Sequence, residues 1–327
     1  MIIPQFVAHQ TGRYTVSYRC ASATLSHSLD VFAPTLDVKA EGPLKLASLC
    51  LETHVTASGR LLCVAFGVHV LDMVTGALLG DTDTYFGMSQ GIAVQDDLFA
   101  TPAARFAQLY QVGATGAPEM LSALPPQGCQ QLAFAGDHLY MTTNTQLVLF
   151  DIKDPKQPRQ VGCLSGDLHN VVPLELSGKL YALSIRNVRS FELSALTMGC
   201  DQAVPPLSQV DLGGEDSASN WVTQGGFLYG ASEHGLEVVD ARQPMALQKV
   251  LHLDMPISAI AVHDGKLFVS EEILGGGRET VYIFDLSDPA QPRPIGKWNA
   301  TDDASFAMTK AKIWVTTGDQ LWSLTVK

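Results

Sequence analysis

Residues 256–298 read PISAIAVHDGKLFVSEEILGGGRETVYIFDLSDPAQPRPIGKW and contain four short, largely apolar runs separated by turn residues. The runs at 257–262 and 267–269 flank a turn at Gly265, which is the pattern of a β-hairpin. Two further runs follow, and the first of them ends at Asp285. The stretch therefore predicts four antiparallel strands within about 40 residues.

The same unit recurs along the whole chain. A turn followed by an apolar strand occurs at eight places, at intervals of 37 to 48 residues. In a second register an apolar run ends in an acidic residue, with proline or glycine four positions later; the clear copies are at Asp30, Asp72, Asp151, Asp240 and Asp285. An aspartate at that position can accept a backbone N–H and close the turn. A four-stranded unit of about 40 residues is typical of a β-propeller blade.

We therefore expect an all-β chain that forms one propeller domain of four-stranded antiparallel blades over residues 1–327. Eight repeats are expected, at about 2–51, 52–83, 88–124, 128–164, 169–212, 218–253, 256–298 and 303–327. The last repeat holds only three strands, so its blade is incomplete or is completed by a chain terminus. The alternative is seven blades, in which the early strands complete the last blade and the rest of the N-terminal region decorates the ring.

Two segments carry a resemblance to a known repeat. VYIFDLSDP at residues 281–289 and LFDIKDP at residues 149–155 resemble the LVIVD repeat, a propeller unit of bacterial and archaeal proteins in the YVTN/WD40-like superfamily. The other copies match more loosely. This resemblance implies the propeller fold, and it implies no single activity because function resides in sites grafted on folds.

Composition narrows the classes of partner. The net charge is −12 and there is no basic stripe, so we expect no nucleic-acid partner. There is no apolar stretch of membrane-spanning length, so we expect a soluble protein that makes no membrane contact. A cytoplasmic location is the expectation, with an extracytoplasmic one as the alternative if a leader was removed. The six cysteines include no CxxC pair, and we expect them to be reduced and structural.

Polar residues gather where the repeats place one mouth of the central channel, at the starts of the innermost strands and in the loops between second and third strands. Imidazole and carboxylate groups can exchange protons there, which makes His54, His169, Asp303 and Glu271 the candidate catalytic residues. The candidate ligand-binding residues are Gln90, Gln130, Asn170, Arg186, Asn220 and Arg278, and the arginines suit an anionic group. We expect no metal and no cofactor.

No nucleophile elbow, phosphate loop or HExxH motif is present. The favoured hypothesis is a non-catalytic binding or scaffold protein that engages a protein or a small polar or anionic ligand at the channel mouth. The alternative is a hydrolase, lyase or isomerase with a histidine and acidic site at the same mouth. Convergence of His54, His169 and an acidic side chain in a closed pocket would favour the enzyme.

Overall fold

The structure is a computed structural model that describes the greater part of the chain. The described residues are 12–20, 23–31, 38–82, 91–102, 106–125, 128–166, 168, 171–184, 186–196, 200, 204–213, 220–232, 234–271, 279–300, 304–309 and 312–326, with side chains from residue 38 onward. No helix within these ranges has the length and apolarity needed to cross a membrane.

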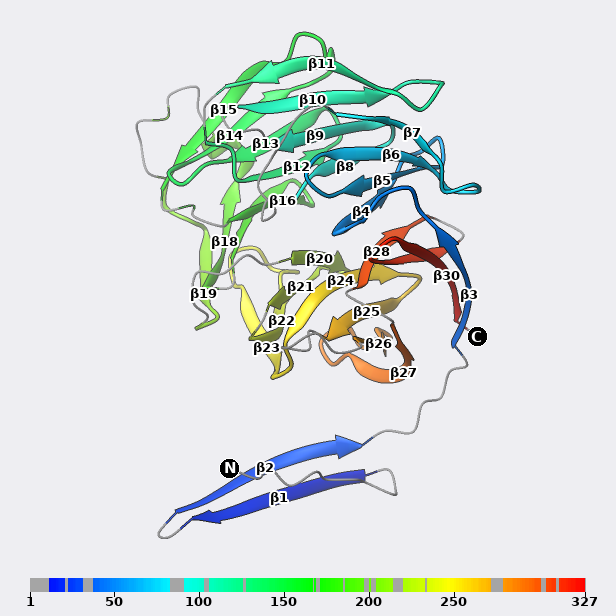
Figure 1. Cartoon of the computed structure of the whole chain (residues 1–327). Helices are drawn as coiled ribbons and strands as arrows, with labels where there is room; N and C mark the ends of the chain where they lie inside the picture. The colour runs from blue at the N-terminus through cyan, green and yellow to red at the C-terminus, as the bar shows by residue number, and fades with distance from the viewer. Residues whose placement is uncertain are drawn as a thin grey trace.

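Seven four-stranded antiparallel sheets are arranged around a common centre (Figure 1). Blade 1 is β4 (Glu52–Val55), β5 (Arg60–Val64), β6 (Val68–Asp72) and β7 (Leu78–Asp81). Blade 2 is β8 (Ala93–Gln95), β9 (Leu98–Pro102), β10 (Ala107–Val112) and β11 (Pro118–Leu124). Blade 3 is β12 (Gln131–Ala135), β13 (His138–Thr142), β14 (Gln146–Asp151) and β15 (Arg159–Ser165). First strands of neighbouring blades contact one another, as β8 does with β12, and the first strands form the inner wall.

The remaining blades repeat this order. Blade 4 is β16 (Val172–Leu176), β17 (Lys179–Leu183), β18 (Asn187–Glu192) and β19 (Ser208–Asp211), with the 3-10 helix η1 (Leu193–Ala195) after β18; blade 5 is β20 (Asn220–Gln224), β21 (Phe227–Ser232), β22 (Gly235–Asp240) and β23 (Gln248–Leu253). Blade 6 is β24 (Ile257–His263), β25 (Lys266–Glu271), β26 (Thr280–Asp285) and β27 (Arg293–Asn299). Blade 7 contains β28 (Ala304–Met308), β29 (Ile313–Thr317) and β30 (Gln320–Val326).

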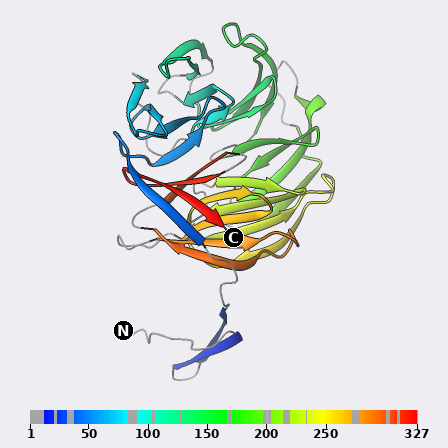
Figure 2. The same ribbon diagram turned by 90° about the vertical axis from the view of Figure 1, so that its right-hand side faces the viewer.

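The fourth strand of blade 7 comes from the N-terminal part of the chain. β3 (Val38–Lys45) pairs antiparallel with β30, with Val38 opposite Val326 and Lys45 opposite Gln320 (Figure 2). The propeller thus has seven blades, and the expectation of eight was wrong. One chain end completes the sheet begun by the other, which is the closure foreseen in the seven-blade alternative.

Residues 12–31, which were expected to belong to an eighth blade, form a separate hairpin. β1 (Gly12–Cys20) and β2 (Ala23–Val31) pair with each other and with no strand of a blade. In this hairpin Gly12 lies opposite Val31 and Cys20 lies opposite Ala23. A period-two alternation of apolar and polar residues marks any half-buried strand, so it does not distinguish a blade from a free hairpin.

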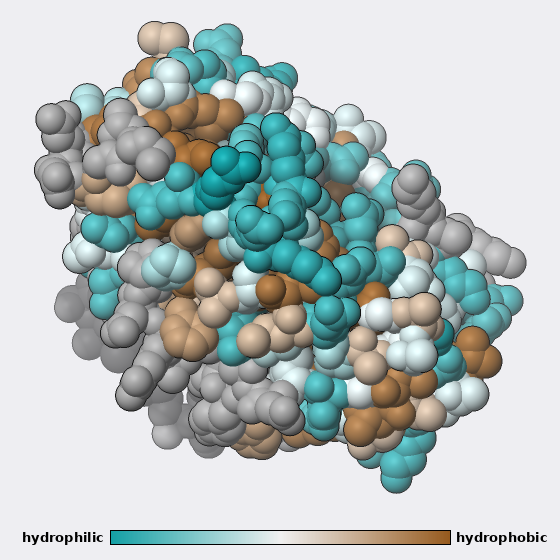
Figure 3. All heavy atoms as spheres, turned by 90° about the horizontal axis from the view of Figure 1, so that it is seen from above, coloured by the Kyte–Doolittle hydropathy of each residue, from teal (hydrophilic) through white to brown (hydrophobic). Residues whose placement is uncertain are grey.

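The apolar cores lie between neighbouring blades. Leu139 and Phe150 of blade 3, for example, share a buried cluster with Ala100 and Leu109 of blade 2. Such clusters follow the ring, so each blade is stabilised by its neighbours rather than by a core of its own. On the face seen in Figure 3, hydrophobic residues lie in separate groups among hydrophilic ones.

Three buried tyrosines at equivalent positions of β13, β17 and β21 connect successive blades through their hydroxyl groups. The Tyr140 hydroxyl donates to Glu175 at 2.6 Å, and the Tyr229 hydroxyl donates to the carbonyl oxygen of Pro289 at 2.8 Å. The Tyr181 hydroxyl reaches the blade 5 turn in the same way. Burial raises the pKa of all three phenols, so they remain neutral donors.

The turn between third and fourth strands depends on the recurring aspartate. Asp72 Oδ1 accepts the backbone N–H groups of Val74 and Thr75, both at 2.9 Å. Asp240 accepts the N–H of Arg242 at 3.1 Å in blade 5, and Asp151 and Asp285 make the equivalent contact in blades 3 and 6. The second sequence register therefore has a local structural cause.

Four of the six cysteines form two disulfides, so the expectation that they are reduced was wrong for these residues. Cys50 is bonded to Cys63 in blade 1, and Cys163 of blade 3 is bonded to Cys200, which lies between β18 and β19 of blade 4. Cys129 is free and buried, and burial raises its pKa to about 12. The partners come together through the fold and not through a short sequence motif.

Candidate functional site

One face of the ring carries the starts of the first strands and the loops between second and third strands. In an antiparallel blade these two features share an edge: Glu52 at the start of β4 lies opposite Val64 at the end of β5. The same holds for Gln131 and Thr142 in blade 3. We call this face the mouth face, and the described candidate residues lie on it.

The two described catalytic candidates have separate partners. His54 Nε2 lies 2.6 Å from Glu52 Oε1, two residues away on the same strand, and both side chains are about one third exposed. Glu271 Oε2 accepts a hydrogen bond from the Tyr282 hydroxyl at 3.1 Å in blade 6. Burial, followed by the Glu271 carboxylate, raises the pKa of Tyr282 to about 12. His169 and Asp303 lie outside the described residues.

The described ligand-binding candidates are engaged in contacts between loops and strands. Gln130 Nε2 donates to Asn144 Oδ1 at 2.5 Å, and Asn220 Nδ2 donates to the carbonyl oxygen of Ser258 at 3.4 Å. Arg186 is exposed on the mouth face. Gln90, Asn170 and Arg278 lie outside the described residues. The amides therefore connect parts of the mouth face to one another.

A buried carboxylate on the mouth face was missed by the sequence reasoning. Glu279 is 2% exposed and accepts hydrogen bonds from the Ser270 hydroxyl, from the Ser258 hydroxyl at 3.2 Å and from the backbone N–H of Ala304 at 2.9 Å. It thus holds blade 6 to blade 7. The sequence did hold one signal for a buried polar partner, which is Ser270. This serine occupies a core position of its strand where the preceding blade has Ala231, and a buried hydroxyl needs a hydrogen-bond partner.

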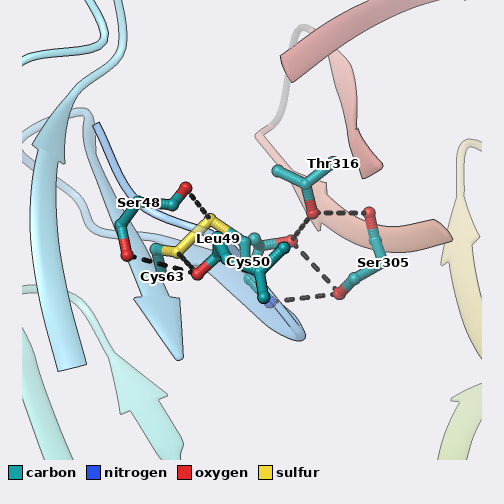
Figure 4. Close-up of a disulfide and its surroundings, with 7 residues drawn as sticks. Ser48, Leu49, Cys50, Cys63, Ser305 and Thr316 are labelled. Carbon is teal, nitrogen blue, oxygen red and sulfur yellow. Dashed lines mark hydrogen bonds between the residues drawn. A yellow bond between two sulfur atoms is a disulfide. The ribbon is translucent and has the colours of Figure 1, made fainter. Parts of the chain in front are cut away.

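Hydroxyl groups connect blades 7 and 1 in a similar way (Figure 4). Ser305 Oγ accepts the backbone N–H of Thr53 at 3.1 Å and lies 3.2 Å from Thr53 Oγ1. Thr316 Oγ1 lies 3.3 Å from Thr53 Oγ1. All three residues are buried. These polar groups pair with one another, so they contribute to ring closure and are not directed into an open pocket.

A second histidine–carboxylate pair lies on the outer strands of blade 5. Glu237 is buried, and its Oε1 is 2.9 Å from His252 Nδ1. Lys249 Nζ lies 3.0 Å from Glu237 Oε2 and also donates to the carbonyl oxygen of Leu212 in blade 4. The ammonium group balances the buried carboxylate and connects the two blades. Among the described residues no group of histidine, cysteine and acidic side chains has an arrangement that could hold a metal ion.

The seam between blades 7 and 1 carries the pocket that adjoins loop 46–51, which connects β3 to β4. The pocket measures about 550 Å³ and is lined by residues 45–49 and 317–320. The loop is fixed by backbone hydrogen bonds: the Leu46 N–H donates to the Asp319 carbonyl at 2.7 Å, and the Cys50 N–H donates to the Gly318 carbonyl at 3.0 Å. The Cys50–Cys63 disulfide adds a covalent bond to blade 1 (Figure 4).

Three large apolar side chains are exposed on loop 46–51 and on the loop that follows β5, and one of them, Leu49, lines this pocket. Leu49, Leu51 and Phe66 have exposed fractions of 51%, 46% and 56%, and we call them the seam patch. The Leu51 N–H donates to the Val64 carbonyl at 2.9 Å and the Leu49 carbonyl lies 3.1 Å from Cys63 Sγ, so the loop runs beside the end of β5, which Phe66 follows two residues later. A group of exposed apolar residues on a fixed loop is typical of an interaction surface.

Comparison with known proteins supports the fold and extends no further. No family model matches the chain, and no curated protein matches it. The LVIVD resemblance of the repeats is thus not confirmed by a family match.

Several solved structures have a similar fold. A chain in the crystal structure of the Mitotic Checkpoint Complex has a TM-score of 0.62 at 10% identity, covering 90% of this chain and 98% of that one. The computationally designed Ika8 protein has a TM-score of 0.58 at 13% identity, with coverages of 87% and 99%. BamB from Moraxella catarrhalis has a TM-score of 0.54 at 12% identity, with coverages of 88% and 100%. At these identities the likeness shows that the chain has a β-propeller fold.

Proposed function

We propose that this chain is a non-catalytic binding propeller that engages a protein partner at the seam patch. The observation that carries the proposal is the exposure of Leu49, Leu51 and Phe66 on the mouth face beside a pocket of about 550 Å³. Backbone hydrogen bonds and a disulfide hold the loop in place, so a partner would lose little free energy in ordering it.

The partner we propose is an extended protein segment with apolar side chains and an excess of basic residues. The apolar side chains match the seam patch, and the pocket beside it accepts a chain segment. The protein has a net charge of −12, and Glu52 follows Leu51 of the patch directly, whereas Asp319 at the pocket is paired with Lys45 at 3.9 Å. An acidic surface attracts basic partners and raises the rate of association.

The other hypotheses from the sequence receive less support. A small polar or anionic ligand would need free polar groups, whereas Gln130, Asn220 and Ser258 bond to neighbouring residues. The enzyme hypothesis depends on His169 and an acidic side chain, Asp303 or Glu271, beside His54, and it stays a prediction. The absence of nucleic-acid and membrane partners and the LVIVD character of the blades also stay predictions.

Selection of a displayed peptide library on the immobilised full chain tests the proposal. Peptides with apolar and basic residues are expected to be enriched over a scrambled library, and their affinity for the chain is then measured by calorimetry. Each substitution Leu49→Ser or Phe66→Ser is expected to weaken binding about tenfold, because each removes part of a buried apolar contact. Met245→Ser is the control, since Met245 is 74% exposed in the turn between β22 and β23 of blade 5.

Two results would overturn the proposal. One is a failure to enrich any peptide above the scrambled library. The other is an enriched peptide that binds the double variant L49S/F66S as tightly as it binds the wild type, since that peptide would be bound elsewhere. Retained affinity of M245S together with loss in both patch variants is the supporting result.

A further inference from the structure

We propose that this chain folds and works in an oxidising compartment, where the pairs Cys50–Cys63 and Cys163–Cys200 are converted to structural disulfides. The inference goes beyond the proposed binding function and does not depend on any partner. It favours an extracytoplasmic location for the chain over the cytoplasmic location expected from the sequence.

The backbone brings each pair to the spacing that a disulfide requires. The Cα–Cα distances are 5.1 Å for Cys50–Cys63 and 5.2 Å for Cys163–Cys200, within the usual range of about 4.4–6.8 Å. Two independent pairs with this spacing, formed between residues 13 and 37 positions apart, argue against chance proximity. Such bonds persist in oxidising compartments and are rare in a reducing cytosol.

The first bond fixes the loop that closes the ring. Cys50 lies in loop 46–51, which leaves the N-terminal strand of blade 7, and Cys63 lies on β5 of blade 1. Cys63 is fully buried and Cys50 is 4% exposed. The bond therefore lies within the seam core, where a reductant has access only after local opening.

The second bond holds an unusually long connection against a neighbouring blade. The β18–β19 connection of blade 4 runs from Glu192 to Ser208 and approaches β15, the outer strand of blade 3. A Cβ on Gly162 would lie 2.8 Å from the Leu196 Cβ, and the Ser165 hydroxyl donates to the Cys200 carbonyl. A long connection loses much entropy on ordering, so a cross-link there stabilises the folded chain.

The chemistry requires an electron acceptor. Each pair loses two protons and two electrons to a disulfide oxidant: a cysteine thiolate attacks the oxidant, a mixed disulfide forms, and the second cysteine displaces the reduced oxidant as a thiolate. The bonds must form while the chain folds, because three of the four cysteines are 4% exposed or less. Cys129 does not compete in the folded chain, since it is 2% exposed and burial disfavours its thiolate.

The test uses the full chain produced in bacterial cells with and without an added export signal. Each preparation is denatured in N-ethylmaleimide without reductant, and intact mass counts the alkylated cysteines. Four of six cysteines are expected to be protected in the exported protein, which leaves at most two alkylated. Digestion without reduction is expected to yield the two cross-linked peptide pairs, and the cytoplasmic preparation is expected to be alkylated at all six.

Thermal unfolding with and without reductant completes the test. Reductant is expected to lower the melting temperature of the exported protein by roughly 5 °C for each bond lost. The double variants C50A/C63A and C163A/C200A are each expected to lose about half of this reductant effect, whereas C129A keeps all of it. Six alkylated cysteines in the exported protein, other pairings, or a melting temperature unaffected by reductant would overturn the inference. Peptide binding is not measured, so this outcome is independent of the proposed function.

Discussion

Removal of the Glu279 carboxylate is expected to weaken the junction between blades 6 and 7. The carboxylate is buried and accepts hydrogen bonds from Ser258, Ser270 and the Ala304 N–H, so Glu279→Ala leaves three donors without their acceptor. Each donor that loses a charged partner costs about 1–3 kcal/mol. Relaxation of the two serine hydroxyls offsets part of the sum, and we expect a net loss of about 3–5 kcal/mol.

The assay is equilibrium unfolding in urea, which gives the free energy of unfolding of each variant. Glu279→Gln keeps one carbonyl acceptor and is expected to lose less than Glu279→Ala. Glu271→Ala is the matched control from the same blade, because Glu271 makes its described side-chain hydrogen bond to Tyr282 alone, and a loss of about 1 kcal/mol is expected. A loss for Glu279→Ala that is no larger than that for Glu271→Ala would refute the reasoning.

Two other substitutions test the junction between blades 3 and 4 and the turn aspartate. Gly162→Ala places a Cβ 2.8 Å from the Leu196 Cβ and is expected to lower the free energy of unfolding by about 1–3 kcal/mol. The control is Gly166→Ala, whose Cβ would meet nothing within 4 Å, and it is expected to lower the free energy of unfolding by less than about 0.5 kcal/mol. Equal losses in the two variants would contradict the contact with Leu196. The backbone N–H of Thr75 holds the pKa of Asp72 below its usual value, so its stabilisation is present above the unfolded-state pKa of about 3.9 and is lost as the pH falls through the lower folded-state pKa. Asp72→Asn is therefore expected to show a smaller fall in stability than the wild type on acidification below about pH 4, measured by thermal unfolding across pH, and identical pH profiles would contradict the assignment.

Local chemistry explains why the sequence predicted the blades and not their number. The hairpin turns and the turn aspartates are satisfied within a few residues, as Asp72 shows with Val74 and Thr75, so their spacing is visible in the sequence. Ring closure depends on Val38 meeting Val326 across the whole chain, and no local pattern records that pairing. Residues 12–31 have the alternation of a blade strand pair but form a hairpin of their own.

The same distinction applies to the candidate site. The repeat register placed Gln130 and Asn220 on the mouth face, because strand order determines which strand ends share an edge. The partner of Asn220 and the burial of Glu279 depend on contacts between blades, whereas the partner of Gln130 is a loop residue of the same blade. The disulfides were missed for the same reason: Cys163 meets Cys200 only because a long connection of blade 4 lies against blade 3.

Cross-linking of the two chain ends tests the closure of the seven-bladed ring most directly. Ala40 lies opposite Leu324 in the pairing of β3 with β30, so A40C/L324C is expected to form an intramolecular disulfide on mild oxidation, detected by mass spectrometry of the unreduced digest. In an eight-bladed ring residues 38–45 would instead pair beside Leu29, and A40C/L29C would form the bond. A cross-link in the first variant and none in the second is the predicted result, and the reverse would contradict the seven-bladed closure.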